Sequence, residues 1–153
     1  MAVTLALMGD VMLGRGVGEV LDRSADPAAF VAGEIRASLA AADLVVANLE
    51  CCISTRGAPW DAPGRPFHFR APPQAADLLA GLGVDCVTLA NNHALDFGPA
   101  ALLDTRDHLR RVGVRCVGAG ADQAEARAGT VLRAGGLRVA VLGVTDHPAD
   151  FAA

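Results

Sequence analysis

The stretch Val84-Asp85-Cys86-Val87-Thr88-Leu89-Ala90-Asn91-Asn92-His93-Ala94-Leu95-Asp96 changes abruptly from apolar to polar. Residues 84–89 have the composition of a buried strand, and a helical pattern opens shortly afterwards at Pro99. Open α/β sheets place their ligand sites at the carboxyl ends of parallel strands, which is where residues 91–96 stand. These residues include two carboxamides, an imidazole and a carboxylate. The sequence therefore predicts a parallel α/β fold with a functional site at this strand end.

Apolar runs alternate with helical patterns on both sides of this stretch. The runs predict strands at 3–8, 43–47, 84–89 and 114–117, and the amphipathic spacing predicts helices from 27, at 73–82, from 99 to 112 and at 121–128. Phe67-His68-Phe69 has the alternation of a short edge strand. Two last strands, 130–133 and 137–142, are separated by Ala134-Gly135-Gly136, which predicts a hairpin. We expect one α/β domain over residues 1–153, with a mostly parallel sheet, flanking helices and a C-terminal β-hairpin.

Composition excludes several classes of protein. The chain has 153 residues, of which 52% are hydrophobic and 20% charged, as in a globular domain. A formal charge of −4 without any basic run argues against a nucleic-acid partner. No apolar stretch reaches the roughly 20 residues of a membrane span, and the N-terminus lacks the basic region of a signal peptide. The expected location is therefore the cytoplasm.

Two familiar site motifs are also excluded. Cys51 and Cys52 are adjacent, which is a poor spacing for zinc, while Cys86 and Cys116 lie in apolar runs and are expected in the core. The glycines that follow the first strand match neither dinucleotide nor phosphate-loop spacing. All the basic residues are arginine, so the lysine of a phosphate loop is absent.

Polar side chains follow the ends of several predicted strands. Their types, carboxylate, carboxamide and imidazole, form an oxygen and nitrogen donor set that suits Mn, Fe, Zn or Mg. The residues are Asp10; Asn48 and Glu50; Asn91, Asn92 and His93; and Asp146 and His147. Each has a simpler reading alone: Asp10 as a helix cap, Glu50 as a solvated loop residue, His147 as part of a terminal tail. Their repeated placement at strand ends favours a shared site.

The segments Gly9–Arg15 (GDVMLGR), Asn48-Leu49-Glu50 and Ala90–Gly98 (ANNHALDFG) resemble the CapA family of capsule and poly-γ-glutamate synthesis proteins. The similarity extends over essentially the whole chain. It implies a metallophosphoesterase-like fold, an αββα sandwich of the calcineurin-like superfamily, of which this chain would be the first half. It also implies a divalent metal centre, usually dinuclear, and an anionic substrate or polymer such as a phosphoester or polyglutamate.

The resemblance also implies roles for individual residues. Asp10, Glu50 and Asn92 resemble metal ligands, and His93 resembles the histidine that assists at the phosphate. Asn48 and Asp96 are expected to support the site, with Asp96 shaping the turn into the following helix. We predict that Arg15 and Asn91 contact the substrate, Arg15 because of its charge and its position near Asp10. His147 is a further candidate metal ligand.

The chain departs from the family pattern in two places. Met12 replaces the histidine usually found two residues after the first aspartate, and the later His-Trp-Gly and Gly-His-x-x-His segments are missing. We therefore expect a chain truncated at its C-terminus. Three hypotheses follow: a metal-dependent phosphoesterase or related hydrolase when the missing histidines are supplied, a non-catalytic polyanion-binding component of polymer synthesis or export, and an inactive fragment. Uncovered apolar surface would favour a homo-oligomer, and many relatives are membrane-associated or exported.

Overall fold

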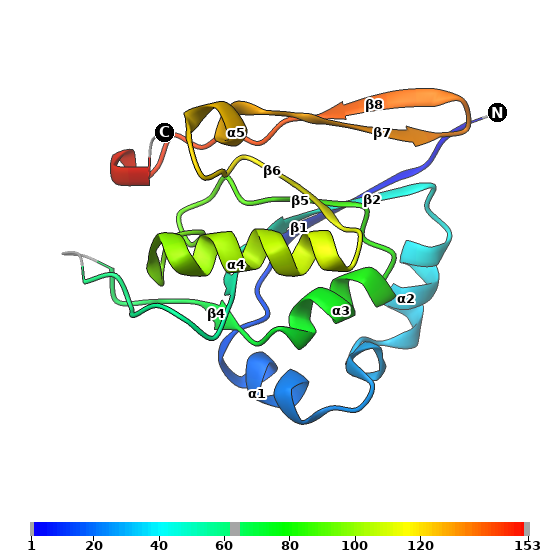
Figure 1. Ribbon diagram of the computed structural model, residues 1–153. Helices are drawn as coiled ribbons and strands as arrows, with labels where there is room; N and C mark the ends of the chain where they lie inside the picture. The colour runs from blue at the N-terminus through cyan, green and yellow to red at the C-terminus, as the bar shows by residue number, and fades with distance from the viewer. Residues whose placement is uncertain (1, 62–64, 152–153) are drawn as a thin grey trace.

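The computed structural model describes residues 2–61 and 65–151. Strands and helices alternate along the chain, as Figure 1 shows. The elements are β1 (Leu5–Val11), α1 (Arg15–Arg23), the 3₁₀ helix η1 (Pro27–Phe30), α2 (Gly33–Ala40), β2 (Leu44–Leu49), β3 (Cys52–Ile53), β4 (Arg70–Ala71), α3 (Gln74–Gly81), β5 (Cys86–Thr88), α4 (Gly98–Arg111), β6 (Arg115–Val117), α5 (Gln123–Arg127), β7 (Thr130–Ala134), β8 (Leu137–Val141) and the 3₁₀ turn η2 (Ala149–Phe151).

A parallel sheet organises the domain. Its four strands have the order β1-β2-β5-β6, and every neighbouring pair is parallel. Helices α1 to α4 cover one face of this sheet, and the antiparallel hairpin β7–β8 lies over the other face (Figure 1). The predicted α/β class, the parallel sheet and the C-terminal hairpin are confirmed. Since all four strands run the same way, their carboxyl ends meet at one edge.

The two faces of the sheet bury different sets of side chains. Val45, Ala47 and Val87 belong to the large cluster beneath the helices. Leu44 and Cys86 point to the opposite face, in a smaller cluster that Leu132 of the hairpin closes. A strand that is buried on both faces loses the usual alternation of polar and apolar residues, which explains the continuous apolar runs in the sequence.

The cysteines are part of this packing. Cys51, Cys52 and Cys86 are buried, Cys116 is half-buried, and all four are free thiols. Burial raises the pKa of Cys51 and of Cys52 to about 12, and that of Cys86 to about 11. These groups therefore stay protonated near neutral pH, whereas metal ligands and nucleophiles require the thiolate.

Several predicted boundaries were wrong. The first strand continues beyond Met8 to Val11, because its pairing with β2 resumes after a bulge between Met8 and Asp10. Helix α1 begins shortly afterwards at Arg15 and was not predicted from the sequence, because the glycines in this stretch interrupt the helical pattern. Gly14 is needed there for close packing, since a Cβ at this position would lie 2.9 Å from the backbone oxygen of Arg70.

Two further segments differ from the sequence-based prediction. The helix expected from Pro27 is divided: the carboxylate of Asp26 caps a 3₁₀ helix, and α2 begins only at Gly33. Residues 67–69 are not a strand, because the pairing partner of β3 is Arg70–Ala71. Residues 52–66 are rich in glycine and proline and are therefore predicted to form a long loop with turns; Pro63 and Gly64 of this stretch lie outside the described residues.

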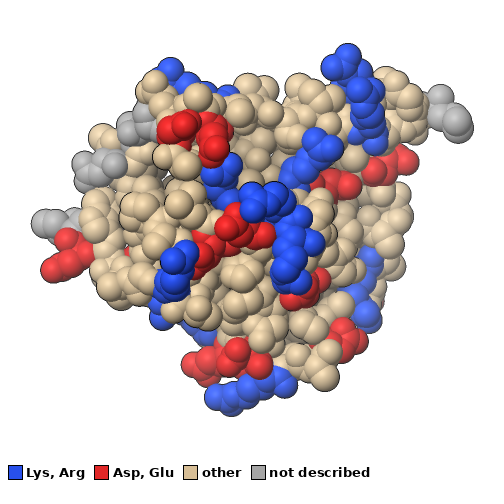
Figure 2. Space-filling view, in the orientation of Figure 1, with Lys and Arg blue, Asp and Glu red and all other residues tan. Residues whose placement is uncertain are grey.

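Helix α4 carries a mixed pattern of charge on its outer surface. Figure 2 shows basic and acidic groups side by side on this face of the molecule. Arg106 pairs with Glu125, Arg110 with Asp107, and Arg111 with Asp77. Exposed ion pairs of this kind contribute little to stability.

No helix within the described residues is long and apolar enough to cross a bilayer.

Thr105 of α4 is expected to be a sensitive position. Its fully buried hydroxyl accepts the N–H of Ile53 at 2.7 Å and donates to the carbonyl of Ala101 at 2.7 Å. Thr105→Val would leave the Ile53 N–H buried without a partner, so we expect a loss of about 1–3 kcal/mol in the free energy of unfolding. Urea titration would measure it, with the exposed Thr4→Val as control. Equal stabilities of the two variants would contradict the prediction.

Candidate functional site

Three strands deliver polar side chains to the same edge of the sheet. Asp10 lies near the end of β1 and pairs in register with Asn48 of β2, and Glu50 follows β2 directly. The backbone N–H of Glu50 donates to the carbonyl of Val11 at 3.0 Å, which fixes this loop beside β1. The loop after β5 brings Asn91 to the same place. The predicted grouping of residues from separate strands is therefore present in the fold.

Asn48 joins the two carboxylates. Its Nδ2 atom donates to Oδ1 of Asp10 at 2.8 Å and to Oε2 of Glu50 at 2.6 Å. Its carbonyl oxygen accepts a hydrogen bond from Nδ2 of Asn91 at 2.9 Å. Each polar atom of the Asn48 side chain is thus used in holding the site together, as expected of a supporting residue.

The two carboxylates are close enough to repel each other. The pKa of Glu50 is raised, first by desolvation and then by the charge of Asp10, while His93 acts in the opposite direction. A pair of carboxylates that share a site favours a proton or a cation between them. This electrostatic feature makes Asp10 and Glu50 suitable for a divalent metal.

Asn91 is turned into the protein. Its side chain donates to Asn48 and to the carbonyl of Leu49, and its Oδ1 atom accepts the N–H of His93. Only 7% of the residue is exposed. The predicted contact with substrate stays a prediction, and the role visible in the fold is to position the loop that carries His93.

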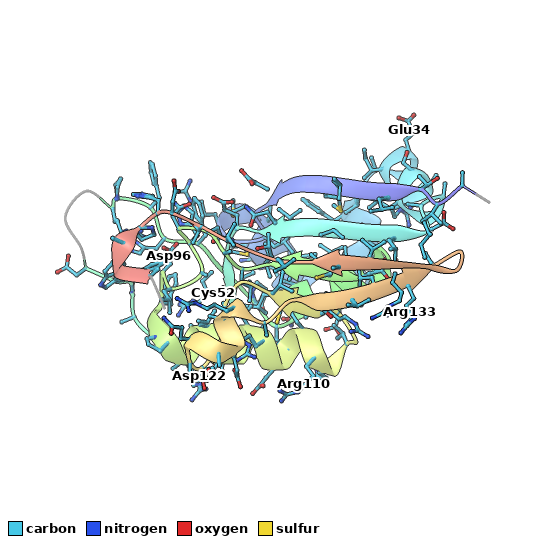
Figure 3. All side chains as sticks on the ribbon, turned by 90° about the horizontal axis from the view of Figure 1, so that it is seen from above. Glu34, Cys52, Asp96, Arg110, Asp122 and Arg133 are labelled. Carbon is cyan, nitrogen blue, oxygen red and sulfur yellow. The ribbon has the colours of Figure 1, made fainter. Side chains whose placement is uncertain are left out.

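His93 and Asp96 form a hydrogen-bonded pair. Nδ1 of His93 lies 2.7 Å from Oδ2 of Asp96, and the same oxygen accepts the N–H of Phe69 at 2.7 Å. Asp96 is fully buried, and Figure 3 places it within the loops at the carboxyl end of the sheet. An aspartate at Nδ1 orients an imidazole and fixes its tautomer, which leaves Nε2 for proton transfer.

Residues of the long loop before β4 cover this pair. Arg65 donates to the carbonyl of Asn92 at 2.7 Å and lies 3.6 Å from Oδ1 of Asp96, an oxygen that accepts no hydrogen bond from the described residues. The guanidinium of Arg65 lies 4.7 Å from the ring centroids of both Trp60 and Phe151, and these two rings contact each other with their centroids 5.0 Å apart. The sequence analysis missed Arg65 and Trp60. The length of their turn-rich loop was the available signal, since long loops in compact domains are commonly functional.

Arg15 contacts the aromatic residues beside His93. Its guanidinium lies over the rings of Phe67 and Phe69, 4.9 and 4.8 Å from their centroids, and the Phe69 ring is 4.1 Å from that of His93. The backbone of Arg15 has φ 53°, an uncommon left-handed conformation for a residue other than glycine. Arg15 is exposed and forms no ion pair with a described residue. It is therefore free to contact an anion.

The two remaining predicted ligands are placed differently. Asn92 is partly exposed, and within the described residues its side-chain amide makes no hydrogen bond. His147 lies in an exposed segment near the C-terminus, where its backbone is bonded to Thr145. No three histidine, cysteine, aspartate or glutamate side chains are grouped for metal binding in the part of the chain that the structure describes. His147 thus does not join Asp10 and Glu50 in such a group.

A groove of about 570 Å³ borders the site on the side of β6. Asn91 and Ala94 form one wall, Gly118, Gly120 and Ala121 another, and Thr145 belongs to the segment that crosses it. Its lining is mostly apolar and does not include Asp10, Glu50 or His93. The groove therefore adjoins the polar residues but is not itself the carboxylate site.

Comparison with known proteins gives a consistent picture. The family model described as "Bacterial capsule synthesis protein PGA_cap" matches residues 4–152. A probable polyglutamine synthesis accessory protein of Mycobacterium tuberculosis is 33% identical over 172 aligned positions, which cover 92% of this chain and 45% of that protein. The capsule biosynthesis protein CapA of Bacillus anthracis is 27% identical, and the alignment covers 94% of this chain and 35% of CapA. The PGA biosynthesis protein CapA of Bacillus subtilis is 25% identical, with 94% and 37% covered. The chain spans less than half the length of each of these relatives.

Proposed function

Because this chain belongs to the bacterial capsule synthesis family PGA_cap, we propose that it serves the synthesis of an anionic polymer through a metal-dependent site at the carboxyl edge of its sheet. The reaction class is hydrolysis of a phosphoester or a related bond. The observation that carries this proposal is the pair Asp10 and Glu50, held by the one amide of Asn48 at 2.8 and 2.6 Å. The parent fold is metallophosphoesterase-like, in which such strand ends hold the metal.

The donor set fits one divalent cation. Asp10 and Glu50 would supply two carboxylates, and Asn92 would supply an amide oxygen that no described residue engages. Oxygen ligands of this kind suit Mg or Mn, whereas a Zn or Fe site would typically include histidine ligands as well. The dinuclear centre that the family resemblance implies stays a prediction, and it would need donors in addition to these three residues. When bound, the cation would neutralise charge on the substrate and polarise the bond to be broken.

The surrounding residues have complementary tasks. The Asp96 carboxylate accepts the Nδ1 hydrogen of His93, so His93, when it is protonated on both ring nitrogens, can give its Nε2 proton to a leaving oxygen and return to the neutral ring. Arg15, stacked on Phe67 and Phe69, offers a guanidinium to an anionic group of the substrate. Arg65 keeps its hydrogen bond to the Asn92 carbonyl and thereby orders the loop that carries Asn92 and His93.

A second function is supported by a separate observation. Arg15 is exposed without an acidic partner among the described residues, whereas the metal donors are few. A polyanion such as polyglutamate could therefore be bound without turnover. Hydrolysis of an aryl phosphodiester with added Mn²⁺, measured beside the affinity for polyglutamate, separates the two functions. Metal-dependent turnover supports the hydrolase; affinity without turnover supports the binding component.

The role of Arg15 can be tested directly. We expect Arg15→Gln to weaken binding of an anionic ligand about 10-fold, since a hydrogen bond to a charged group contributes roughly 1.5–3 kcal/mol. The exposed Arg36→Gln on α2 is the control, because it removes the same charge from a distant helix. Titration calorimetry with polyglutamate and with phosphate would measure both variants. Equal weakening in the two would show a general charge effect, and the assignment of Arg15 would fail.

A further inference from the structure

Two backbone groups decide the orientation of the Asn91 side-chain amide. The carbonyl of Leu49 can only accept a hydrogen bond, and Nδ2 of Asn91 donates to it at 2.9 Å. The N–H of His93 can only donate, and Oδ1 of Asn91 accepts it at 2.9 Å. An amide turned over would place oxygen against oxygen and N–H against N–H, so both hydrogen bonds would be lost. Since Asn91 is only 7% exposed, water has little access to replace them.

Asn91 passes this orientation on to Asn48. Its Nδ2 atom also donates to Oδ1 of Asn48, at 2.9 Å. Because this contact needs the oxygen of the Asn48 amide, the NH₂ group of Asn48 has to face the other way. There it donates to Asp10 at 2.8 Å and to Glu50 at 2.6 Å. The polarity of two backbone groups is thus carried through two carboxamides to the two carboxylates.

We propose that Asn91 is a positioning residue for the metal site, which sets the direction of the Asn48 amide and so holds Asp10 and Glu50 in place for a cation. The inference rests on the proposed metal-dependent function. Asn48 engages one oxygen of each carboxylate, Oδ1 of Asp10 and Oε2 of Glu50, and leaves the second oxygen of each for the metal. A pair that is ordered before the cation arrives loses less conformational freedom on binding it.

Asn91 also holds the third proposed ligand. The hydrogen bond from the His93 N–H to Oδ1 of Asn91 closes a turn whose middle residue is Asn92. One side chain therefore connects the carboxylates at the ends of β1 and β2 with the loop after β5, which carries Asn92 and the histidine. Because all of these contacts lie between described residues in the interior of the site, they do not depend on what covers the outer surface of the domain.

A double-mutant cycle in Mn²⁺ affinity, measured by isothermal titration, tests this connection. Asn91→Ser keeps a hydroxyl that can accept the His93 N–H, and it removes the donor to Asn48. We expect Asn91→Ser and Asn48→Ala each to weaken Mn²⁺ binding about 10-fold or more, as for residues that orient metal ligands. Since both changes interrupt the same path, Asn91→Ser should have no further effect in the Asn48→Ala background. Losses that multiply, or an unchanged affinity in Asn91→Ser, would overturn the proposal.

The metal-free protein provides a second readout. The chain has three asparagines and two glutamines, so few side-chain NH₂ signals occur in its ¹⁵N–¹H NMR spectrum. In Asn91→Ser we expect the NH₂ signals of Asn48 to shift and to exchange faster with water, because its oxygen has lost the donor that fixed the amide. The signals of Gln74, on α3, are the internal control and should stay in place. Unmoved Asn48 signals would overturn the proposal.

The two readouts separate this inference from the proposed function. A parent chain that binds no Mn²⁺ would overturn the metal-dependent function, and the NMR comparison would still show whether Asn91 sets the Asn48 amide. A parent chain that binds Mn²⁺ as tightly as Asn91→Ser would overturn the inference alone.

A second variant serves if circular dichroism shows that Asn91→Ser does not fold. Asn91→Asp keeps the size of the side chain and the acceptor for the His93 N–H, but it places an oxygen opposite Oδ1 of Asn48. The Asn48 amide should then turn over, and its NH₂ signals should move while those of Gln74 stay. An Asn48 amide that keeps its signals in this variant would equally overturn the proposal.

Discussion

Replacing Glu50 with glutamine is expected to lower the affinity for Mn²⁺ by about 100-fold or more, since even residues that only orient metal ligands cost 10- to 100-fold. The shape of the side chain is conserved, and the hydrogen bond at 2.6 Å from Asn48 has an oxygen acceptor in either residue. The substitution removes the negative charge of Glu50, which lies beside that of Asp10 at the ends of β2 and β1. Isothermal titration of the metal-free protein with Mn²⁺ would measure the difference.

The same variant should not lose stability in the absence of metal. The pKa of Glu50 is raised, by burial and by Asp10, so the folded state binds the proton more tightly than the unfolded state does. Near neutral pH the ionised Glu50 therefore lowers the free energy of unfolding, and a neutral glutamine relieves that effect. Loss of metal affinity with equal or greater apo stability is the expected signature. The exposed Glu34→Gln on α2 is the control and should change neither quantity. Unchanged Mn²⁺ affinity in Glu50→Gln would remove Glu50 from the metal site.

Replacing Asp96 with asparagine is expected to reduce the free energy of unfolding by about 3 kcal/mol, the size of effect seen when one partner of a buried charge pair is removed. Asp96 is fully buried, and only 14% of the Arg65 side chain is exposed. One carboxylate oxygen holds both the Phe69 N–H and His93, and the other faces Arg65. Asparagine keeps the size of the side chain but leaves Arg65 without a counter-charge and offers an N–H₂ group where acceptors are needed.

Asp107→Asn is a suitable control for this loss. Asp107 also pairs with an arginine, Arg110 at 2.8 Å, but both side chains are mostly exposed. Its removal should cost less than about 1 kcal/mol. Urea unfolding of the two variants would show whether burial makes the difference, and equal costs would contradict the structural role of Asp96. Turnover of the Asp96 variant should also fall, because His93 would lose the group that fixes its tautomer.

Much of the fold could be read from the sequence because its signals are local. Strand β5 and helix α3 follow directly from an apolar run and an amphipathic stripe, and the double glycine gives the hairpin. The family segments likewise lie at the strand ends, so Asp10, Asn48 and Glu50 could be assigned to one edge once the sheet was predicted to be parallel. Helix α1 was not predicted because Gly16 and Gly18 weaken its helical pattern. Of these two, Gly18 lies at a close approach, since a Cβ there would be 3.2 Å from the backbone oxygen of Leu13.

The arrangement around His93 could not be read in this way. Phe69 and Asp96 are separated by 27 residues along the chain, as are Arg65 and Asn92, and no spacing rule connects them. Asp96 was expected to support the site and to shape the turn into the following helix; the contacts through which it does so, to His93, to the Phe69 backbone and to Arg65 of a distant loop, are visible only in the structure. A buried carboxylate needs partners, and the loop before β4 supplies them.

The sequence by itself determined the parallel α/β class, most of the strands and helices, and the chemical types that stand at the strand ends, because period and polarity are properties of neighbouring residues. Only the tertiary structure decided which of those groups touch. It brought Asp10 and Glu50 to the same amide of Asn48 and enclosed Asp96 beside Arg65. These outcomes depend on contacts between segments far apart in the chain, where packing and the pairing of buried polar groups, rather than local propensity, set the geometry.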